Sequence, residues 1–192
     1  MAGKACDTLS AMKRLALLFI ATGLAVPVVA QTASQRDPGF RTVTQVALVT
    51  KNVEASAQRW AKLIGVETPK ITETLPGEEV HMVYKGKASN ARAKLAFIKA
   101  GQVTIELIEP VGAGSAWKKY LDEHGEGVHH IAFNVQSLAN ARAELKAQGY
   151  EEIHSGRWEP DKVTSGNGDY VYFDTTKALG LMIELLHADS EK

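Results

Sequence analysis

The sequence predicts an α+β protein built from two copies of a β-α-β-β-β module in a single chain. Two observations support this prediction. A strand-turn-helix pattern occurs twice, and the same Ile-Glu-Leu strand motif follows it in both halves. The chain has 192 residues, of which 45% are hydrophobic and 23% charged. This suits one sizeable soluble domain, or two small modules that share a core.

The first thirty residues differ from the rest of the chain. Lys4, Lys13 and Arg14 precede the uncharged run "LALLFIATGLAVPVVA". A basic start, a short apolar run and small residues are typical of a secretory signal peptide. We therefore expect residues 1–30 to form a signal peptide that is cleaved after Ala30. An uncleaved anchor is the alternative, but the run is shorter than the ~20 residues that a membrane span needs.

Composition after this cleavage excludes several kinds of site. The single cysteine, Cys6, lies in the predicted signal peptide, so the mature chain has none. This excludes a disulfide framework and a thiolate metal site. The full chain balances 22 basic against 22 acidic residues without basic clusters, which argues against a nucleic-acid partner. We expect a periplasmic or secreted protein that is not held to the membrane.

The repeat begins with a strand and a helix. The segments "QVALVTKNVEASAQRWAKLIGVE", from Gln45, and "HIAFNVQSLANARAELKAQGYE", from His130, align without gaps over their first nineteen positions. Each combines an alternating strand, a polar turn and an amphipathic helix. Gly65 and Gly149 follow the two helices, as left-handed C-caps do.

The strands that follow extend the repeat. "VTIELIEP" at 103–110 and "GLMIELLH" at 180–187 are similar, and further segments with strand character precede each of them. These segments are "HMVYK" and "KLAFIKA" in the first half, and "EEIHSGRW" and "YVYFD" in the second. We expect a flexible segment over 31–40, module one over 41–110, a Gly-rich linker with a short helix over 111–127, and module two over 128–187. A duplication explains this order.

Four polar residues occupy strand positions opposite the large aliphatic side chains, which we expect to pack on the helices. They are Gln45, Glu106, His130 and Glu184. The repeat pairs Gln45 with His130 and Glu106 with Glu184, so a pseudo-twofold axis would bring all four together. Burying two carboxylates without a cation is costly. One imidazole, one amide oxygen and two carboxylates suit a divalent Zn, Ni, Co, Mn or Fe ion.

The remaining histidines have no such pairing. Taken singly, a histidine at the start of a strand is more often structural than a metal ligand. Strand alternation places His129 on the aliphatic side, as a structural or half-exposed neighbour. The other histidines have no partner in the repeat, and we expect them at the surface: His81, His124, His154 and His187.

The quoted segments, together with "GVHHIAF", resemble the vicinal oxygen chelate superfamily, which includes lactoylglutathione lyase (glyoxalase) and methylmalonyl-CoA epimerase. The resemblance covers residues 41–187. It implies a cupped, eight-stranded mixed sheet around a divalent metal ion, known as the glyoxalase/bleomycin-resistance/dioxygenase fold. The family's ligand positions fall on Gln45, Glu106, His130 and Glu184. Glutamine at the first position is similar to glyoxalases, whereas "IELIEP" and "GVHHIAF" are similar to epimerases.

The resemblance implies a metal-dependent lyase or isomerase that stabilises an enolate after proton abstraction next to a carbonyl or thioester. Glu184 is the first candidate for the general base and Glu106 the second. The predicted signal peptide conflicts with coenzyme A and glutathione substrates, which are mainly cytosolic. A non-catalytic small-molecule binding protein of the same fold is the alternative. A metal-dependent dioxygenase is a third, disfavoured because it needs two histidines and one glutamate.

The oligomeric state stays open at this level. Both modules lie in one chain, so a monomer could hold a complete site. Members of the superfamily are often dimers, and edge strands could pair between two copies of this chain.

Overall fold

The computed structural model describes residues 39–159 and 167–189. The predicted signal peptide lies outside these residues. Within them, the structure contains no helix with both the length and the apolar character that a membrane span requires.

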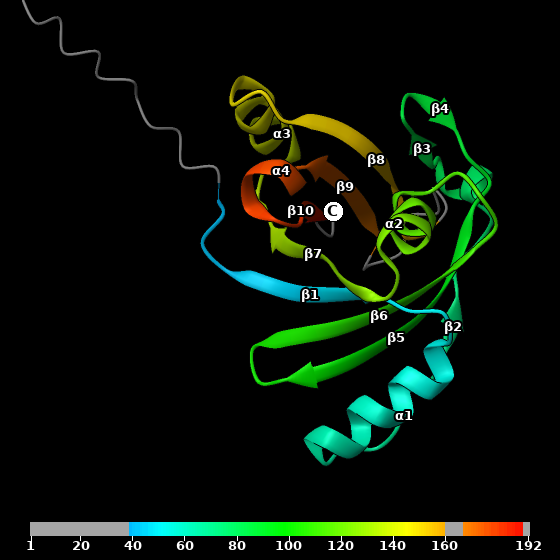
Figure 1. The fold of residues 1–192 in the computed structure, drawn as a ribbon. Helices are drawn as coiled ribbons and strands as arrows, with labels where there is room; N and C mark the ends of the chain where they lie inside the picture. Colours follow the sequence, from blue (N-terminus) through cyan, green and yellow to red (C-terminus); the bar gives the residue numbers. More distant parts are fainter. Residues whose placement is uncertain (1–38, 160–166, 190–192) are drawn as a thin grey trace, which may run out of the picture. The chain divides into compact units, whose positions relative to one another are not determined.

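The described residues form one mixed sheet of ten strands in the order β2-β5-β6-β1-β7-β10-β9-β8-β3-β4. The strands are β1 (Val43–Val49), β2 (Thr72–Glu73), β3 (Val83–Tyr84), β4 (Lys87–Ala88), β5 (Arg92–Ala100), β6 (Val103–Val111), β7 (Gly127–Asn134), β8 (Glu151–Arg157), β9 (Gly168–Asp174) and β10 (Met182–Ala188). The sheet is curled (Figure 1), as the predicted cupped sheet requires.

The strand order contains two equivalent blocks. The first half of the chain supplies β2-β5-β6-β1 and the second supplies β7-β10-β9-β8. Strands β1 and β7 pair antiparallel where the blocks meet, whereas β1–β6 and β7–β10 are parallel pairs. This arrangement is the one expected from a duplicated module.

The β3–β4 hairpin accounts for the difference from eight strands. The segment expected to form one strand instead turns back at Lys85 and Gly86, whose φ angles are 49° and 73°. Two adjacent residues with positive φ make the tight turn that suits a β-hairpin. Although β3 comes from the first half, it pairs with β8 of the second half. The first half of the chain therefore contributes one hairpin to the outer edge of the second block.

The described helices are α1 (Val53–Ile64), the 3₁₀ helix η1 (Gly77–Val80), α2 (Ala116–His124), α3 (Leu138–Ala147) and α4 (Thr176–Leu179). Helix α1 begins where the Asn52 side chain accepts a hydrogen bond of 2.7 Å from the backbone N–H of Ala55. It ends at Gly65, which has a φ of 80° and confirms the predicted cap. Helix α2 lies in the predicted linker.

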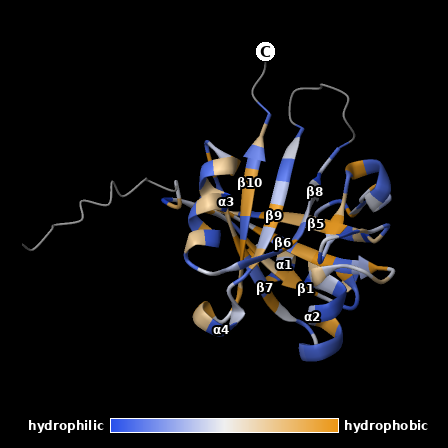
Figure 2. Ribbon diagram, turned by 90° about the horizontal axis from the view of Figure 1, so that it is seen from above, coloured by the Kyte–Doolittle hydropathy of each residue, from blue (hydrophilic) through white to orange (hydrophobic). Residues whose placement is uncertain are grey.

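Helices α1 and α3 cover the outer surface of the sheet, as the sequence predicts. Leu48, Ile105 and Leu107 belong to a cluster with residues of α1. Ile183 and Leu185 belong to a second cluster, with residues of α3. Strand β10 accordingly carries both hydrophobic and hydrophilic residues in Figure 2, because its two faces differ.

Helix α2 lies within the curve of the sheet (Figure 1) and packs against its inner face. Trp117 of this helix is buried in one cluster with Ala47, Ile108 and Tyr172. The Trp117 Nε1–H donates a hydrogen bond of 3.2 Å to the hydroxyl of Tyr172. Aromatic side chains therefore fill the inner face over the second block of strands.

Candidate metal site

Three of the four predicted ligands meet on the inner face of the sheet. Glu106 of β6, His130 of β7 and Glu184 of β10 each place a ligand atom within 4.8 Å of the others. The Nε2 atom of His130 lies 3.5 Å from Glu106 Oε2 and 3.0 Å from Glu184 Oε2. The three side chains are 10%, 0% and 4% exposed in the order Glu106, His130, Glu184. We call this cluster the triad.

Strand register places the fourth predicted ligand on the same face. Ala47 of β1 is the partner of both Glu106 and His130. In the next row, Ala132 is the partner of both Gln45 and Glu184. Directly opposed residues project from the same face of a sheet. Gln45 therefore faces the triad side and is half-buried, and the small alanines leave room above β1 and β7.

The electrostatics of the triad favour a cation. Burial raises the pKa of Glu106, and the neighbouring Glu184 carboxylate adds to this rise although His130 opposes it. Burial alone would lower the pKa of His130, but the Glu184 and Glu106 carboxylates outweigh it and raise that pKa to about 9. Two buried carboxylates thus stabilise any positive charge between them.

Two buried polar atoms without hydrogen-bond partners also favour a cation at the triad. His130 Nε2 and Glu184 Oε2 have no hydrogen-bond partner within the described part of the chain, even though they are close to each other. Leaving such buried atoms unpaired is costly. A divalent ion between them would satisfy both, and one nitrogen with several oxygens is a donor set that zinc and its neighbours accept. The residues present therefore fit a metal ion.

His129 is buried, as a structural residue would be, but its predicted place on the aliphatic side is wrong. On β1, Ala47 pairs with His130 and Leu48 pairs with Val128, so His129 is an extra residue without a partner. Such a β-bulge breaks the alternation of faces on which the prediction rested. His129 is fully buried, and its Nδ1 lies 2.9 Å from Nδ1 of His130.

This contact can orient the His130 ring. If Nε2 of His130 holds a metal, its proton must lie on Nδ1, which then donates to Nδ1 of His129. Burial, followed by the nearby His130 and His154, lowers the pKa of His129 well below its usual range. His129 is therefore neutral and able to accept this hydrogen bond.

Replacing His129 with phenylalanine is accordingly expected to weaken metal binding by about 10- to 100-fold, the usual effect of losing a partner of a metal ligand. Titration against a coloured chelator measures the dissociation constant. His129→Asn is the matched control, because its amide oxygen can accept the same hydrogen bond and should restore part of the affinity. If His129→Phe and the wild type bind the metal with equal affinity, His129 does not support His130 as a ligand.

The surface prediction for His154 is also wrong. His154 is 1% exposed, and its ring centroid lies 4.7 Å from that of Trp117 and 5.3 Å from that of Tyr172. A register shift after Glu152 turns its side chain inward. His187 is half-buried, with Nδ1 2.9 Å from the Val135 carbonyl oxygen. The other two, His81 and His124, are exposed as predicted.

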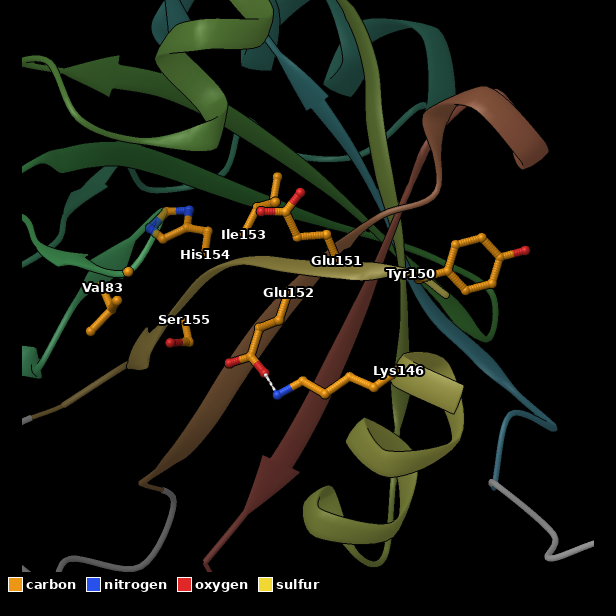
Figure 3. Close-up of a pocket in the computed structure, with 9 residues that line it drawn as sticks. Val83, Lys146, Tyr150, Glu151, Glu152, Ile153, His154 and Ser155 are labelled. Carbon is orange, nitrogen blue, oxygen red and sulfur yellow. Dashed lines mark ion pairs between the residues drawn. The ribbon is translucent and has the colours of Figure 1, made fainter. Parts of the chain in front are cut away.

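A cavity of about 400 Å³ lies away from the triad, along β8 between the β3–β4 hairpin and the end of α3. Figure 3 shows Lys146 reaching across to Glu152, where the two charges lie 2.8 Å apart. The residues that line this cavity are Val83, Gly86, Lys146 and 150–155. None of them belongs to the triad, so we place the candidate chemistry at the triad and not in this cavity.

Comparison with known proteins agrees with this fold. A sequence model of the Glyoxalase/Bleomycin resistance protein/Dioxygenase superfamily matches residues 44–173. The chain belongs to this superfamily. The resemblance inferred from the sequence is thereby confirmed, and so is the fold class. Metal dependence is typical of the superfamily, and the triad is a group that can hold a metal ion.

Individual relatives within the superfamily are distant. The chain is 26% identical over 144 residues to the ethylmalonyl-CoA/methylmalonyl-CoA epimerase of Cereibacter sphaeroides, covering 74% of this chain and 95% of that protein. It is 39% identical over 62 residues to the protein YqjC of Bacillus subtilis, covering 32% of this chain and only 44% of YqjC. A variant of Streptomyces coelicolor methylmalonyl-CoA epimerase, solved with 2-nitronate-propionyl-CoA, has a TM-score of 0.52 and 19% identity, covering 77% of this chain and 97% of that one.

Proposed function

We propose that this superfamily member is a metal-dependent isomerase or lyase that removes a proton from a carbon next to a carbonyl or thioester. The buried triad, with Gln45 on the same face, is the observation that carries the proposal. Similarity to the C. sphaeroides epimerase supports the isomerase branch. Non-haem iron oxygenases bind their metal through two histidines and one carboxylate. The triad has one histidine and two carboxylates, which disfavours a dioxygenase.

Metal binding and proton transfer fall to different side chains of the site. A bound divalent ion supplies Lewis acidity for negative charge that develops on a substrate oxygen. His130, Glu184 and Gln45 would hold the ion. Glu106 would take the proton, because burial raises the pKa of its carboxyl group and so makes it a stronger base. Glu184, the first candidate from the sequence, has the more enclosed side chain and is assigned to binding.

The substrate class is a small carbonyl compound or thioester. The ligand in the S. coelicolor epimerase, a propionyl-CoA derivative, supports a thioester. Export of this chain, which we also propose, favours a smaller carbonyl compound. N-terminal sequencing of the protein secreted by its host tests export, because the mature chain should then begin at Gln31.

Proton exchange tests the reaction. In deuterated water, metal-loaded protein is expected to place deuterium on the α-carbon of methylmalonyl-CoA or of the glutathione hemithioacetal of methylglyoxal, as seen by NMR. Removal of the metal with a chelator should slow the exchange more than about 100-fold, since the enolate then lacks its main stabilisation. Zinc, nickel or cobalt should restore it.

Two outcomes would redirect the proposal. Tight binding of a carbonyl compound without exchange would favour the binding-protein alternative. Oxygen uptake with catechols would favour the dioxygenase.

A further inference from the structure

The inner face of the sheet is covered unevenly. At one end of β5 and β6, Leu95 and Ile108 pack into the core beneath α2. Two rows away on β5, Phe97 is 44% exposed and Lys99 is exposed as well. Phe97 and Lys99 lie on the same face of β5 as Leu95, because side chains alternate along a strand. The inner face therefore opens towards solvent at Phe97 and Lys99.

Strand register connects this opening to the triad. Phe97 is the direct partner of Glu106, and Lys99 is the direct partner of Thr104. Thr104 in turn is the partner of Gln45 on β1. Phe97 thus flanks the carboxylate assigned as the base, and Lys99 lies in the row of the predicted amide ligand.

The ammonium group of Lys99 is held over the sheet. Its Nζ donates a hydrogen bond of 2.9 Å to Oγ1 of Thr104, whose own exposure is only 7%. Within the described residues, Lys99 has no acidic group at ion-pair distance, whereas Lys94 of the same strand pairs with Glu109 at 3.3 Å on the outer face. An unpaired ammonium beside a metal site is a receptor for an anion.

We propose that Phe97 and Lys99 form a substrate subsite that recognises a carboxylate next to an apolar segment. This proposal rests on the proposed function, since the reacting carbon must lie at Glu106. The carboxylates of Glu106 and Glu184 would balance the charge of a divalent ion beside them, so the triad would offer a substrate little net positive charge. Lys99 supplies a single positive charge, which one carboxylate neutralises in full.

The spacing limits the length of the substrate. Thr104 and Glu106 are two residues apart on β6, which corresponds to roughly 7 Å along the strand. An acidic group bound by Lys99 therefore lies a few bonds away from the carbon that loses its proton. The subsite selects a short carbonyl compound with a carboxylate at one end and an apolar stretch over the ring of Phe97.

Two hydroxamates of equal length test this selection, because a hydroxamate chelates a divalent ion through two neighbouring oxygens. N-hydroxysuccinamic acid carries a terminal carboxylate, and N-hydroxybutanamide carries a methyl group in its place. Calorimetry on the zinc-loaded full chain is expected to show about fivefold tighter binding of the acid, a modest factor because water screens an exposed ammonium. Lys99→Gln should abolish this preference.

Two further variants serve as controls. Lys94→Gln removes the same charge from the outer face of the same strand, and we expect it to retain the preference for the acid. Phe97→Ala should weaken both hydroxamates equally without changing the zinc content, because Phe97 contacts the apolar segment that they share.

The outcomes separate the two proposals. If wild-type protein binds both hydroxamates equally, or if Lys99→Gln keeps the preference, the subsite is refuted while metal chelation stands. If the protein takes up no metal, or if neither hydroxamate binds the loaded protein, the proposed function itself fails and the subsite with it.

Discussion

Replacing His130 with alanine is expected to abolish stoichiometric metal binding. The change removes the single imidazole of the triad and leaves Glu106 and Glu184 buried close together with the same sign of charge. We expect the dissociation constant to rise more than about 100-fold, because even the loss of a hydrogen-bond partner of a ligand costs 10- to 100-fold. Metal analysis after gel filtration measures the bound ion, and the deuterium-exchange rate should fall in parallel.

The surface residue His124 offers a matched control for this experiment. Its side chain is 60% exposed at the end of α2, so His124→Ala should bind one ion per chain like the wild type. Circular dichroism of both variants separates loss of the ligand from loss of the fold. Metal binding by His130→Ala with wild-type affinity would refute the triad as the metal site.

Much of the fold follows from local patterns. The repeated strand-helix segments and the shared Ile-Glu-Leu motif predicted both blocks of the sheet, because alternation and helical spacing are short-range signals. The same alternation predicted that Glu106, His130 and Glu184 share a face. Their convergence then required only that the halves pair through β1 and β7, which a duplication favours.

The errors arose where strands depart from regular pairing. A bulge at His129 and a register shift before His154 each turn a side chain inward, and neither leaves a clear signal in the alternation of polar and apolar residues. The pairing of β3 with β8 depends on contacts between distant segments. Lys99 was missed because its importance depends on its partner across the hairpin, Thr104, and not on its neighbours in the sequence.

Acidification is expected to destabilise the protein through His154. Burial, followed by the positive charge of His130, lowers the pKa of His154 to about 3, whereas an exposed histidine has a pKa of about 6.5. At pH values between these two pKa values, His154 is protonated in the unfolded chain but stays neutral in the folded chain. The free energy of unfolding therefore falls as the pH falls, by about 1.4 kcal/mol per pH unit. From pH 6.5 to 4.5, His154 should contribute a loss of roughly 2 kcal/mol, because the histidine of the unfolded chain is already half protonated at pH 6.5.

His154→Phe isolates this contribution, because the other titrating groups are present in both proteins. Denaturant unfolding of the metal-free proteins at pH 6.5 and 4.5 should show a loss smaller by roughly 2 kcal/mol in the variant. At pH 6.5 the variant should be at least as stable as the wild type, since both ring nitrogens of His154 are buried without a hydrogen-bond partner among the described residues. Equal acid losses in the two proteins would mean that His154 is protonated in the folded state. The folded protein would then hold a buried cation against the rings of Trp117 and Tyr172. Such a charge is unfavourable in an enclosed aromatic cluster.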